Sequence, residues 1–270
     1  MRLHAITGLP RSGSTLLAQI LNQNPIFYAS PTSIMPQIVS MLSMTFSGSP
    51  EIKSALAKGK EVTEAKIDRC VKSVIEAWYD GKEVVFDKGR GWCHNALILK
   101  RLYPEAKMFV TVRDLRNVFA TIEKEYGKNP VLDMAANPLE KTVYERANQM
   151  FSPQGIIGLP INGVEDLLRR KPDNAVIIQF ETFVKSPKLI MEKIYAEIKE
   201  PYFEHDFDNV SEVSEDSGLY DAVHLNKFPH TVHKKVEPRD DYEWKKFVSD
   251  DVARLIMEKF NGYNRAFGYS

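Results

Sequence analysis

Short apolar runs alternate with longer amphipathic stretches along most of the chain. The apolar runs are bounded by polar residues and predict buried strands. They cover residues 3–7, 83–86, 107–112 and 175–180. The amphipathic stretches predict helices. They cover residues 14–22, 61–79, 92–103, 115–126, 186–199 and 241–266. This alternation favours an α/β fold with a central parallel sheet of about four to five strands flanked by helices.

Two segments interrupt the alternation. Residues 152–163 (SPQGIIGLPING) are rich in glycine and proline and predict a loop between helices. Residues 201–240 have weak periodicity and mixed charge, which is typical of a lid or of a loop that binds cofactor or substrate. The chain has no internal repeat, so we expect residues 1–270 to form one domain.

Composition argues against two classes of partner. Lysine plus arginine equals aspartate plus glutamate, 36 each, so the positive field of a nucleic-acid-binding protein is absent. No apolar run reaches the length of about 18 residues that a membrane span needs, and no apolar leader precedes the first predicted strand. We therefore expect no nucleic-acid partner, no membrane span and a cytoplasmic protein. The two cysteines, Cys70 and Cys93, lack metal-ligand spacing and are expected to be buried thiols.

The turn after the first predicted strand carries a phosphate-binding motif. Residues 8–15 read GLPRSGST. Gly8, Gly13 and Thr15 fit the G-x-x-x-x-G-K-[ST] pattern of loops that cradle phosphates. Ser14 stands where that pattern has lysine. The turn is therefore either a degenerate nucleotide triphosphatase loop or a loop for a different phosphate ligand.

Both interpretations predict an anion site. A glycine-rich turn that enters a helix directs backbone N–H groups and the positive end of the helix dipole to one place. The hydroxyls of Ser12, Ser14 and Thr15 add donors, and Arg11 is the nearest cation. A loop lysine reaches the β- and γ-phosphates of a triphosphate. Arg11 stands three positions earlier than that lysine and suits a shorter anion.

A second candidate phosphate motif follows the predicted strand 107–112. Arg113 comes directly after this strand, and Thr121 lies eight residues later on the next predicted helix. A fixed guanidinium and a hydroxyl about two helical turns along can clamp a terminal phosphate. The order of the two motifs strengthens both, because a phosphate loop precedes this pair in the same chain.

These stretches resemble one enzyme family. Residues 10–17 (PRSGSTLL) resemble the 5′-phosphosulfate loop of sulfotransferases that use 3′-phosphoadenosine 5′-phosphosulfate (PAPS). The arginine and threonine of the second motif resemble the family's 3′-phosphate motif, with threonine in place of serine. Residues 84–114 are similar to the protein-tyrosine sulfotransferase branch, and Lys88 falls on its active-site lysine. Residues 177–187 (IIQFETFVKSP) also resemble a family segment.

The resemblance implies a reaction. A sulfuryl group would move from PAPS to a hydroxyl or amine acceptor, with adenosine 3′,5′-bisphosphate (PAP) as product and no metal. Arg11, Lys88 and the loop amides would neutralise charge on the leaving 5′-phosphate, by analogy with phosphoryl transfer. The implied cofactor-binding residues are Pro10, Arg11, Ser12, Gly13, Ser14, Thr15, Arg113 and Thr121, with Thr231, Lys234 and Lys235 in the 201–240 segment.

The general base is missing from its family position. Protein-tyrosine and heparan sulfotransferases use a glutamate that follows the loop, and the equivalent place here, residues 30–33, holds no acid. Residues 12–50 contain no Asp, Glu, His, Lys or Arg at all. Cytosolic sulfotransferases use a histidine just after the strand that carries the matched lysine, so Asp87 and His94 are candidate catalytic groups. The histidines at 230 and 233 are further candidates.

Two other functions fit parts of the pattern. The strand that ends at Asp87 resembles the strand that helps to hold Mg²⁺ in a P-loop small-molecule kinase, although the loop lysine is missing. The absent glutamate fits a non-catalytic nucleotide-binding protein. The acceptor remains open among peptide tyrosine, glycan, lipid and small alcohol, as does the oligomeric state. Residues 34–46, apolar and methionine-rich, either line the acceptor cleft or pack in the core.

Overall fold

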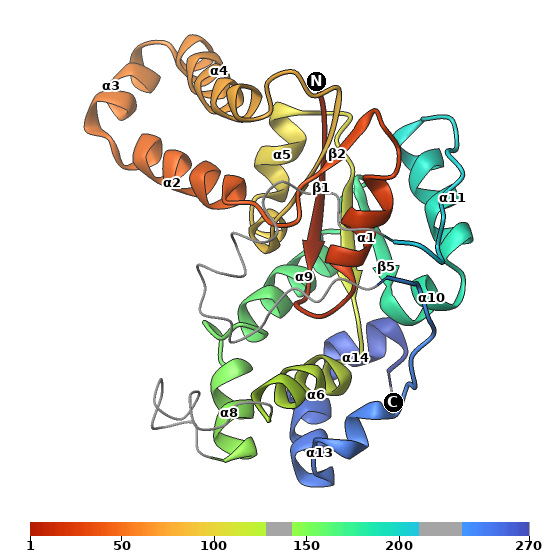
Figure 1. Cartoon of the computed structure of the whole chain (residues 1–270). Helices are drawn as coiled ribbons and strands as arrows, with labels where there is room; N and C mark the ends of the chain where they lie inside the picture. The colour runs from red at the N-terminus through yellow and green to blue at the C-terminus, as the bar shows by residue number, and fades with distance from the viewer. Residues whose placement is uncertain (128–141, 211–233, 270) are drawn as a thin grey trace.

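The computed structural model describes residues 1–127, 142–210 and 234–269. It contains a five-stranded sheet of order β2-β3-β1-β4-β5 in which every neighbouring pair is parallel (Figure 1). The strands are β1 (Arg2–Gly8), β2 (Phe27–Ala29), β3 (Val84–Lys88), β4 (Met108–Val112) and β5 (Ala175–Gln179). The predicted α/β fold with a parallel sheet of four to five strands is confirmed.

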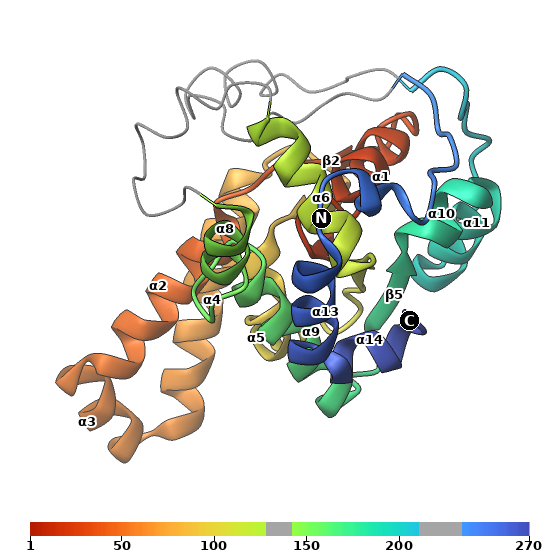
Figure 2. The same ribbon diagram turned by 90° about the horizontal axis from the view of Figure 1, so that it is seen from below.

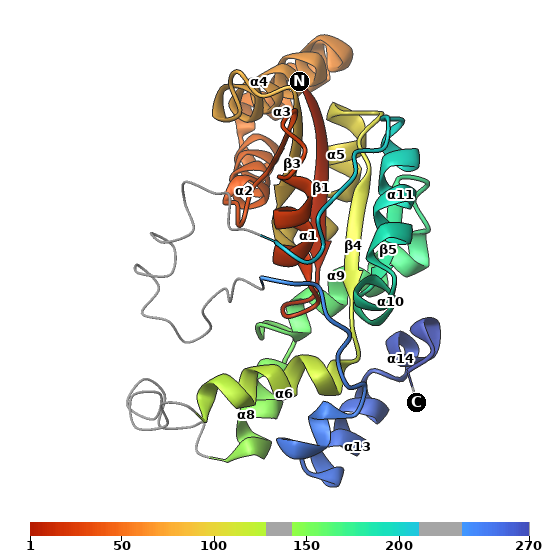
Figure 3. The same cartoon turned by 45° about the vertical axis from the view of Figure 1, so that its right-hand side comes forward.

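Three helices cover one face of the sheet (Figure 3). They are α1 (Ser14–Leu21), α10 (Phe180–Lys185) and α11 (Pro187–Ile198). Their apolar side chains pack with Ile6, Phe86 and Phe109 from the strands. α11 begins with a proline, whose missing N–H costs nothing at the first helical position.

On the opposite face, Leu3, Val85 and Val110 belong to a larger hydrophobic core that a second set of helices shares, some over the sheet and some beyond its carboxyl edge (Figure 1). This set contains α2 (Met35–Gly48), α4 (Lys60–Trp78), η1 (Arg90–Cys93), α5 (Ala96–Leu102), α6 (Leu115–Tyr126), α8 (Val143–Met150), α9 (Gly158–Arg170), η2 (Glu243–Lys246), α13 (Asp250–Lys259) and α14 (Asn261–Phe267). α2, α3 (Pro50–Lys58) and α4 form an arm that extends away from the sheet (Figures 1 and 2), and α3 buries none of its residues. No helix in the described ranges is long and apolar enough to cross a membrane.

The carboxyl ends of the strands meet at one edge, where ligands bind in parallel α/β sheets. Ile6 of β1 pairs with Lys88 of β3, and Gly8 of β1 pairs with Thr111 of β4. The turns after these three strands therefore lie together. Because successive side chains on a strand point to opposite faces, Lys88 faces α1 whereas Asp87 faces the side of α4 and η1.

Some elements differ from the sequence prediction. β2 was missed because its three residues are too few to show a strand period. Residues 152–163 are only partly a loop, because α9 begins at Gly158 and carries Pro160 in its first turn, where a missing N–H is tolerated. Cys93 is buried, but Cys70 is exposed on α4, so the expectation that both thiols are buried is wrong.

Of the segment 201–240, residues 201–210 and 234–240 are described and contain no helix or strand. The two parts are joined by backbone hydrogen bonds from the Val210 N–H to the Lys234 carbonyl and from the Val236 N–H to the Phe207 carbonyl, both 2.8 Å. The predicted residues Thr231, His230 and His233 lie outside the described residues. The role of this segment as a lid stays a prediction.

Candidate functional site

The turn between β1 and α1 has the backbone that its glycines predict. Gly8 (φ 116°) and Gly13 (φ 85°) both lie in the left-handed region, which glycine adopts without strain. A Cβ atom on Gly8 would lie 2.1 Å from the carbonyl oxygen of Thr111, so β1 and β4 approach each other too closely for any side chain here. Helix α1 begins at Ser14, directly after this turn. The turn therefore has the amides and the helix dipole of an anion site.

Ser12 fixes this turn from the inside. Its side chain is fully buried, donates to the Leu9 carbonyl (2.6 Å) and shares a hydrogen bond with the Thr111 hydroxyl (2.7 Å). The hydroxyl of Ser12 thus attaches the turn to β4 instead of facing a ligand. The other predicted loop residues are partly exposed: Pro10, Arg11, Gly13, Ser14 and Thr15.

Lys88 reaches the turn from the end of β3. Its ammonium Nζ donates to the hydroxyl of Thr15 (2.7 Å) and to the carbonyl of Pro31. Burial, with a smaller contribution from the positive charge of Arg90, lowers the pKa of Lys88 to about 7. An ammonium has three N–H donors, so one donor is left for an anion bound at the turn.

Arg113 connects the turn to the second predicted motif. Its Nη1 donates to the backbone carbonyl of Arg11 (3.0 Å) and to the hydroxyl of Thr121 (3.4 Å). The guanidinium also lies 4.2 Å from the centre of the Phe180 ring, a cation–π contact. The Nε of Arg113 is buried and has no hydrogen-bond partner. The structure thus brings Arg113 and Thr121 together beside the backbone of Arg11. The Thr121 hydroxyl itself donates to the Asn117 carbonyl (2.8 Å).

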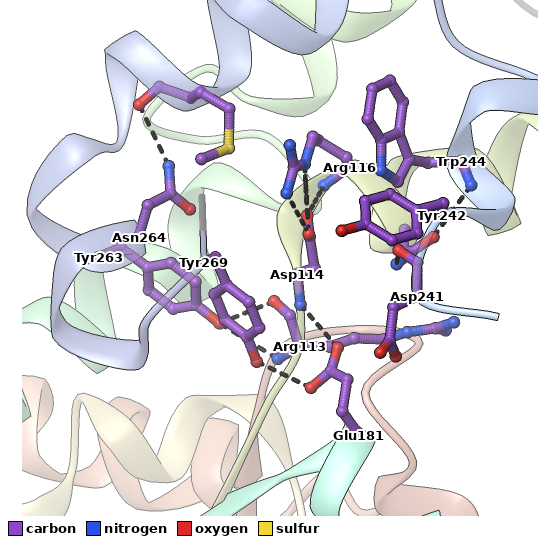
Figure 4. A network of polar contacts seen from close by, with 12 residues as sticks. Arg113, Asp114, Arg116, Glu181, Asp241, Tyr242, Trp244, Tyr263, Asn264 and Tyr269 are labelled. Atoms are coloured by element: carbon purple, nitrogen blue, oxygen red, sulfur yellow. Dashed lines mark hydrogen bonds and ion pairs between the residues drawn. The ribbon is translucent and has the colours of Figure 1, made fainter. Parts of the chain in front are cut away.

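A network of polar contacts holds the backbone around Arg113 (Figure 4). The Tyr263 hydroxyl accepts from the N–H of Arg113 (3.2 Å) and donates to its carbonyl (3.0 Å). Glu181 accepts from the Asp114 N–H (3.1 Å) and from the Tyr269 hydroxyl (2.9 Å). Burial lowers the pKa of Arg113, and the negative charge of Glu181 opposes this shift. The network therefore fixes the position of Arg113 and supplies a neighbouring carboxylate.

The first turn of α6 belongs to the same network. Asp114 accepts from the Arg116 N–H (2.8 Å) and from its guanidinium (2.7 Å), which lies 4.9 Å from the centre of the Trp244 ring. Asn117 donates to the carbonyl of Asp241 (2.9 Å) and accepts from the N–H of Trp244 (3.1 Å). The C-terminal part of the chain thereby packs on the helix that carries the threonine of the second motif.

Asp87 is buried on the other side of β3 and is 0% exposed. Its Oδ2 accepts from the Ser33 hydroxyl (2.8 Å) and from the Tyr79 hydroxyl (2.5 Å). Its Oδ1 accepts from the Trp92 indole (2.7 Å). Burial raises the pKa of Asp87, and these three hydrogen bonds oppose the shift. Both oxygens are committed to protein donors, so the carboxylate has no exposed atom to offer an acceptor.

His94 lies at the C-terminal end of η1 and is exposed. Its imidazole lies beside Gly163 of α9, because a Cβ atom built on that glycine would be 3.2 Å from the ring atoms Cε1 and Nε2. This position leaves the ring accessible. No contact between His94 and Lys88 is found among the described residues, and the proposed role of His94 as base stays a prediction.

The predicted lysines of the 201–240 segment lie on the surface. Lys234 and Lys235 are exposed, and the ammonium of Lys235 pairs with the carboxylate of Asp208 (2.9 Å). Their predicted contact with cofactor stays a prediction, as does that of Thr231. Over residues 1–127, 142–210 and 234–269, no group of three or more His, Cys, Asp or Glu side chains is placed to hold a metal ion.

Several residues that shape the site were not singled out by the sequence. Phe180 lies under the guanidinium of Arg113, Tyr263 holds its backbone, and Tyr79 and Trp92 hold Asp87. All four are buried aromatic residues, and such residues are ordinary core components in a hydrophobic pattern. The available signals were the family-like segments 84–114 and 177–187, which contain Trp92 and Phe180.

Comparison with solved structures finds proteins with the same fold. The chain is similar to the sulfotransferase domain of the Synechococcus PCC 7002 olefin synthase, with 18% identity, a TM-score of 0.53 and coverage of 96% of this chain and 94% of that chain. It is also similar to the sulfotransferase domain from the curacin biosynthetic pathway, with 15% identity, a TM-score of 0.53 and coverage of 96% of this chain and 97% of that chain. A third similar structure is mouse sulfotransferase SULT7A1 complexed with PAP, with 13% identity, a TM-score of 0.50 and coverage of 98% of this chain and 84% of that chain. At these identities the structural matches show a shared fold.

The family itself is shown by a sequence model. The model described as "Sulfotransferase family" matches residues 5–204. This match covers most of the chain and includes the turn after β1, Lys88, and the Arg113 and Thr121 pair. The particular likeness to the protein-tyrosine branch is not established by these comparisons. The chain belongs to the sulfotransferase family.

Proposed function

We propose that this sulfotransferase uses PAPS as its sulfuryl donor and a hydroxyl or an amine as acceptor. The turn after β1 would bind the 5′-phosphosulfate through its amides. Arg113 and Thr121 would bind the 3′-phosphate. The family match supports sulfuryl transfer, and the two candidate phosphate sites in one chain support a donor with phosphate groups at both positions.

The observation that carries this proposal is the bridge formed by Arg113. One guanidinium nitrogen contacts both the carbonyl of Arg11 in the turn and the hydroxyl of Thr121 on α6. A second nitrogen, Nε, is buried without a hydrogen-bond partner. An unsatisfied buried donor costs free energy, and a bound anion would remove that cost with a charge-assisted hydrogen bond. The side chains present therefore fit a nucleotide with a terminal phosphate.

In the proposed reaction, the acceptor oxygen or nitrogen forms a bond to sulfur while the bond from sulfur to the bridging oxygen breaks. The electron pair of the broken bond stays on the 5′-phosphate of PAP, and the acceptor proton goes to a base or to water. Negative charge therefore develops at the 5′ end of the donor. Lys88, Arg11 and the turn amides would stabilise this charge, which is usually the largest contribution to catalysis of this kind.

Lys88 has two described contacts that suit this role. Its bond to Thr15 places the ammonium at the first turn of α1, and its bond to Pro31 holds it from the opposite side. With a pKa of about 7, Lys88 is only partly charged at neutral pH. A bound anion favours the charged form, so the donor itself would complete the charge that its leaving group needs.

Asp87 does not fit the kinase alternative. A kinase needs an aspartate that reaches Mg²⁺ near the phosphates, whereas both oxygens of Asp87 accept from Ser33, Tyr79 and Trp92 on the face opposite Lys88. The same contacts leave it poorly placed as a general base, which must come within hydrogen-bond reach of the acceptor. His94 is the described candidate that remains accessible.

The proposal is tested by following labelled sulfuryl groups from PAPS to a panel of acceptors: a phenol, a tyrosine peptide, a glycan and an aliphatic alcohol. Label should appear in the product of at least one class. If the chain binds PAP yet transfers label to none of them, the non-catalytic alternative is correct. In the same assay, His94→Ala should lower turnover by about 100-fold if His94 is the base, and full turnover would remove it as a candidate.

A further inference from the structure

Residues 30–33, which connect β2 to α2, contact Lys88 at two points. The Ser30 hydroxyl accepts the backbone N–H of Lys88 (2.8 Å), and the Pro31 carbonyl accepts its ammonium. We call residues 30–33 the strap. The strap therefore holds both the backbone and the charged end of the lysine, although it contains no ionisable residue.

The far end of the strap is attached to Asp87. The Ser33 hydroxyl donates to Oδ2 of Asp87 (2.8 Å) and accepts from the Met35 N–H at the start of α2 (2.9 Å). Asp87 is in turn fixed by Tyr79 from α4 and by Trp92 from η1. A buried carboxylate with three donors is a rigid anchor, because removal of any partner leaves a buried polar group less satisfied.

Successive side chains of β3 point to opposite faces of the sheet, and the strap connects the two faces. Asp87 and Lys88 are neighbours in sequence but face opposite sides of the sheet, so Asp87 cannot reach the turn directly. The strap passes from one face to the other, since Ser33 contacts Asp87 while Pro31 contacts Lys88. The carboxylate is thus connected to the ammonium through three residues of backbone.

We propose that Asp87 is a positioning residue, which acts through Ser33 to hold the strap against Lys88 and so places the ammonium at the turn after β1. This role replaces that of general base, and it rests on the proposed function because its effect is measured in PAP binding. The strap accepts two of the hydrogen bonds that orient Lys88. A second ammonium donor bonds to Thr15 at the start of α1, which leaves the third donor for an anion at the turn.

The test compares two substitutions that each remove one hydroxyl from the same carboxylate. Ser33→Ala removes the strap's own hydrogen bond to Asp87, whereas Tyr79→Phe loses a longer contact with the Ser33 hydroxyl (3.5 Å) but keeps the hydrogen bond from Ser33 to Asp87 (2.8 Å). Loss of one hydrogen bond to a charged group should weaken PAP binding by about tenfold in Ser33→Ala. Tyr79→Phe and the conservative Ser33→Thr should bind PAP within about twofold of the unchanged protein, because the strap keeps its hydroxyl. Calorimetry without acceptor gives these affinities.

A second readout follows the charge of Lys88. At pH 8 the unchanged protein should take up about one proton with PAP, because the buried lysine is mostly neutral until the anion binds. Arg90 is the charged group that lowers its pKa, while Thr15 and Pro31 are neutral acceptors. When the strap is released, water reaches Lys88 and raises its pKa in the protein without PAP. Ser33→Ala should therefore take up less than one proton when PAP binds. A purely structural role for Ser33 would not change proton uptake.

The outcomes separate the inference from the function on which it rests. If the unchanged protein binds no PAP, the proposed function fails. If it binds PAP and Ser33→Ala binds equally well, or Tyr79→Phe weakens binding as much as Ser33→Ala, the strap role is wrong. Should Ser33→Ala not fold, Asp87→Asn answers the same question. Weaker PAP binding supports positioning, whereas unchanged binding with lower turnover identifies Asp87 as the base.

Discussion

Two buried cations lie at the two ends of the proposed donor site, and their surroundings differ. Arg113 is 7% exposed and Lys88 is 8% exposed. The carboxylate of Glu181 lies in the network around Arg113 and favours its charged form. Lys88 donates to the neutral oxygens of Thr15 and Pro31, and the pKa of its ammonium falls to about 7.

The difference shows which charge depends on the ligand. A guanidinium stays protonated in proteins, whereas a buried lysine loses its proton readily. The contrast has a simple origin in the sequence, because residues 12–50 supply no carboxylate to the 5′ side of the site. We therefore expect Arg113 to act as a permanent anion site and Lys88 to become fully charged only when the donor binds.

Lys88→Met should have the largest effect. It removes the ammonium but keeps an unbranched side chain, and loss of one group that stabilises the leaving charge should slow single-turnover sulfuryl transfer by about 1,000-fold. Lys107→Met is the matched control, since Lys107 pairs with Glu197 just before β4 at the opposite edge of the sheet. That control should keep full activity. Equal rates for Lys88→Met and the unchanged protein would contradict the comparison.

Arg113→Ala should weaken PAP binding by about 100-fold, because it removes a planar donor that makes charge-assisted hydrogen bonds. The PAP affinity of Arg113→Lys should lie between those of Arg113→Ala and the unchanged protein, since an ammonium keeps the charge but lacks the planar set of donors. Arg101→Ala is the control: Arg101 is exposed on α5, where it pairs with Asp68 (2.9 Å). Calorimetry measures these affinities. Equal PAP affinity in Arg113→Ala and Arg101→Ala would contradict the proposed 3′ site.

The pH dependence of PAP binding should report Lys88. Its free pKa is about 7, and a bound anion raises it, so the protonated protein binds more tightly. Affinity should be greatest below pH 7 and fall by up to about tenfold per pH unit above it, until the pKa of the bound state is passed. Lys88→Met should flatten this profile. A profile that keeps its slope in Lys88→Met would assign the titration to another group.

Tyr269→Phe should have the smallest effect on binding. It removes the hydrogen bond from Tyr269 to Glu181 (2.9 Å) but leaves Tyr263 on the backbone of Arg113. The free energy of unfolding should fall by about 1 kcal/mol, while PAP affinity should change by less than about threefold. Chemical denaturation and calorimetry measure the two quantities. A large loss of affinity would show that the network, more than Arg113 itself, determines the 3′ site.

Much of both candidate phosphate sites could be predicted from the sequence, because their signals are local. Gly8 and Gly13 need positive φ, and Arg113 and Thr121 keep a spacing that one strand end and one helix impose. The predicted contact between Lys88 and the turn also follows from local order, since β3 ends at the same edge as β1. Parallel pairing converts such separate turns into one site.

The remainder could not be predicted because it depends on which side chains meet once the elements have packed. Ser33, Tyr79 and Trp92 meet on Asp87 from three separate elements, and a hydrophobic pattern treats each as an ordinary core or turn residue. Asp87 was therefore expected to be catalytic by its place beside Lys88. The two faces of a strand separate neighbouring side chains, and for that reason we propose a positioning role for Asp87 in place of the catalytic one.

The most direct test of the donor assignment is a calorimetric titration of the whole chain with PAP and, separately, with Mg·ATP. PAP should bind without Mg²⁺ and at least about tenfold more tightly than ATP, because in our proposal Arg113 and Thr121 bind a 3′-phosphate that ATP lacks. Tight binding of Mg·ATP together with no heat from PAP would contradict the assignment.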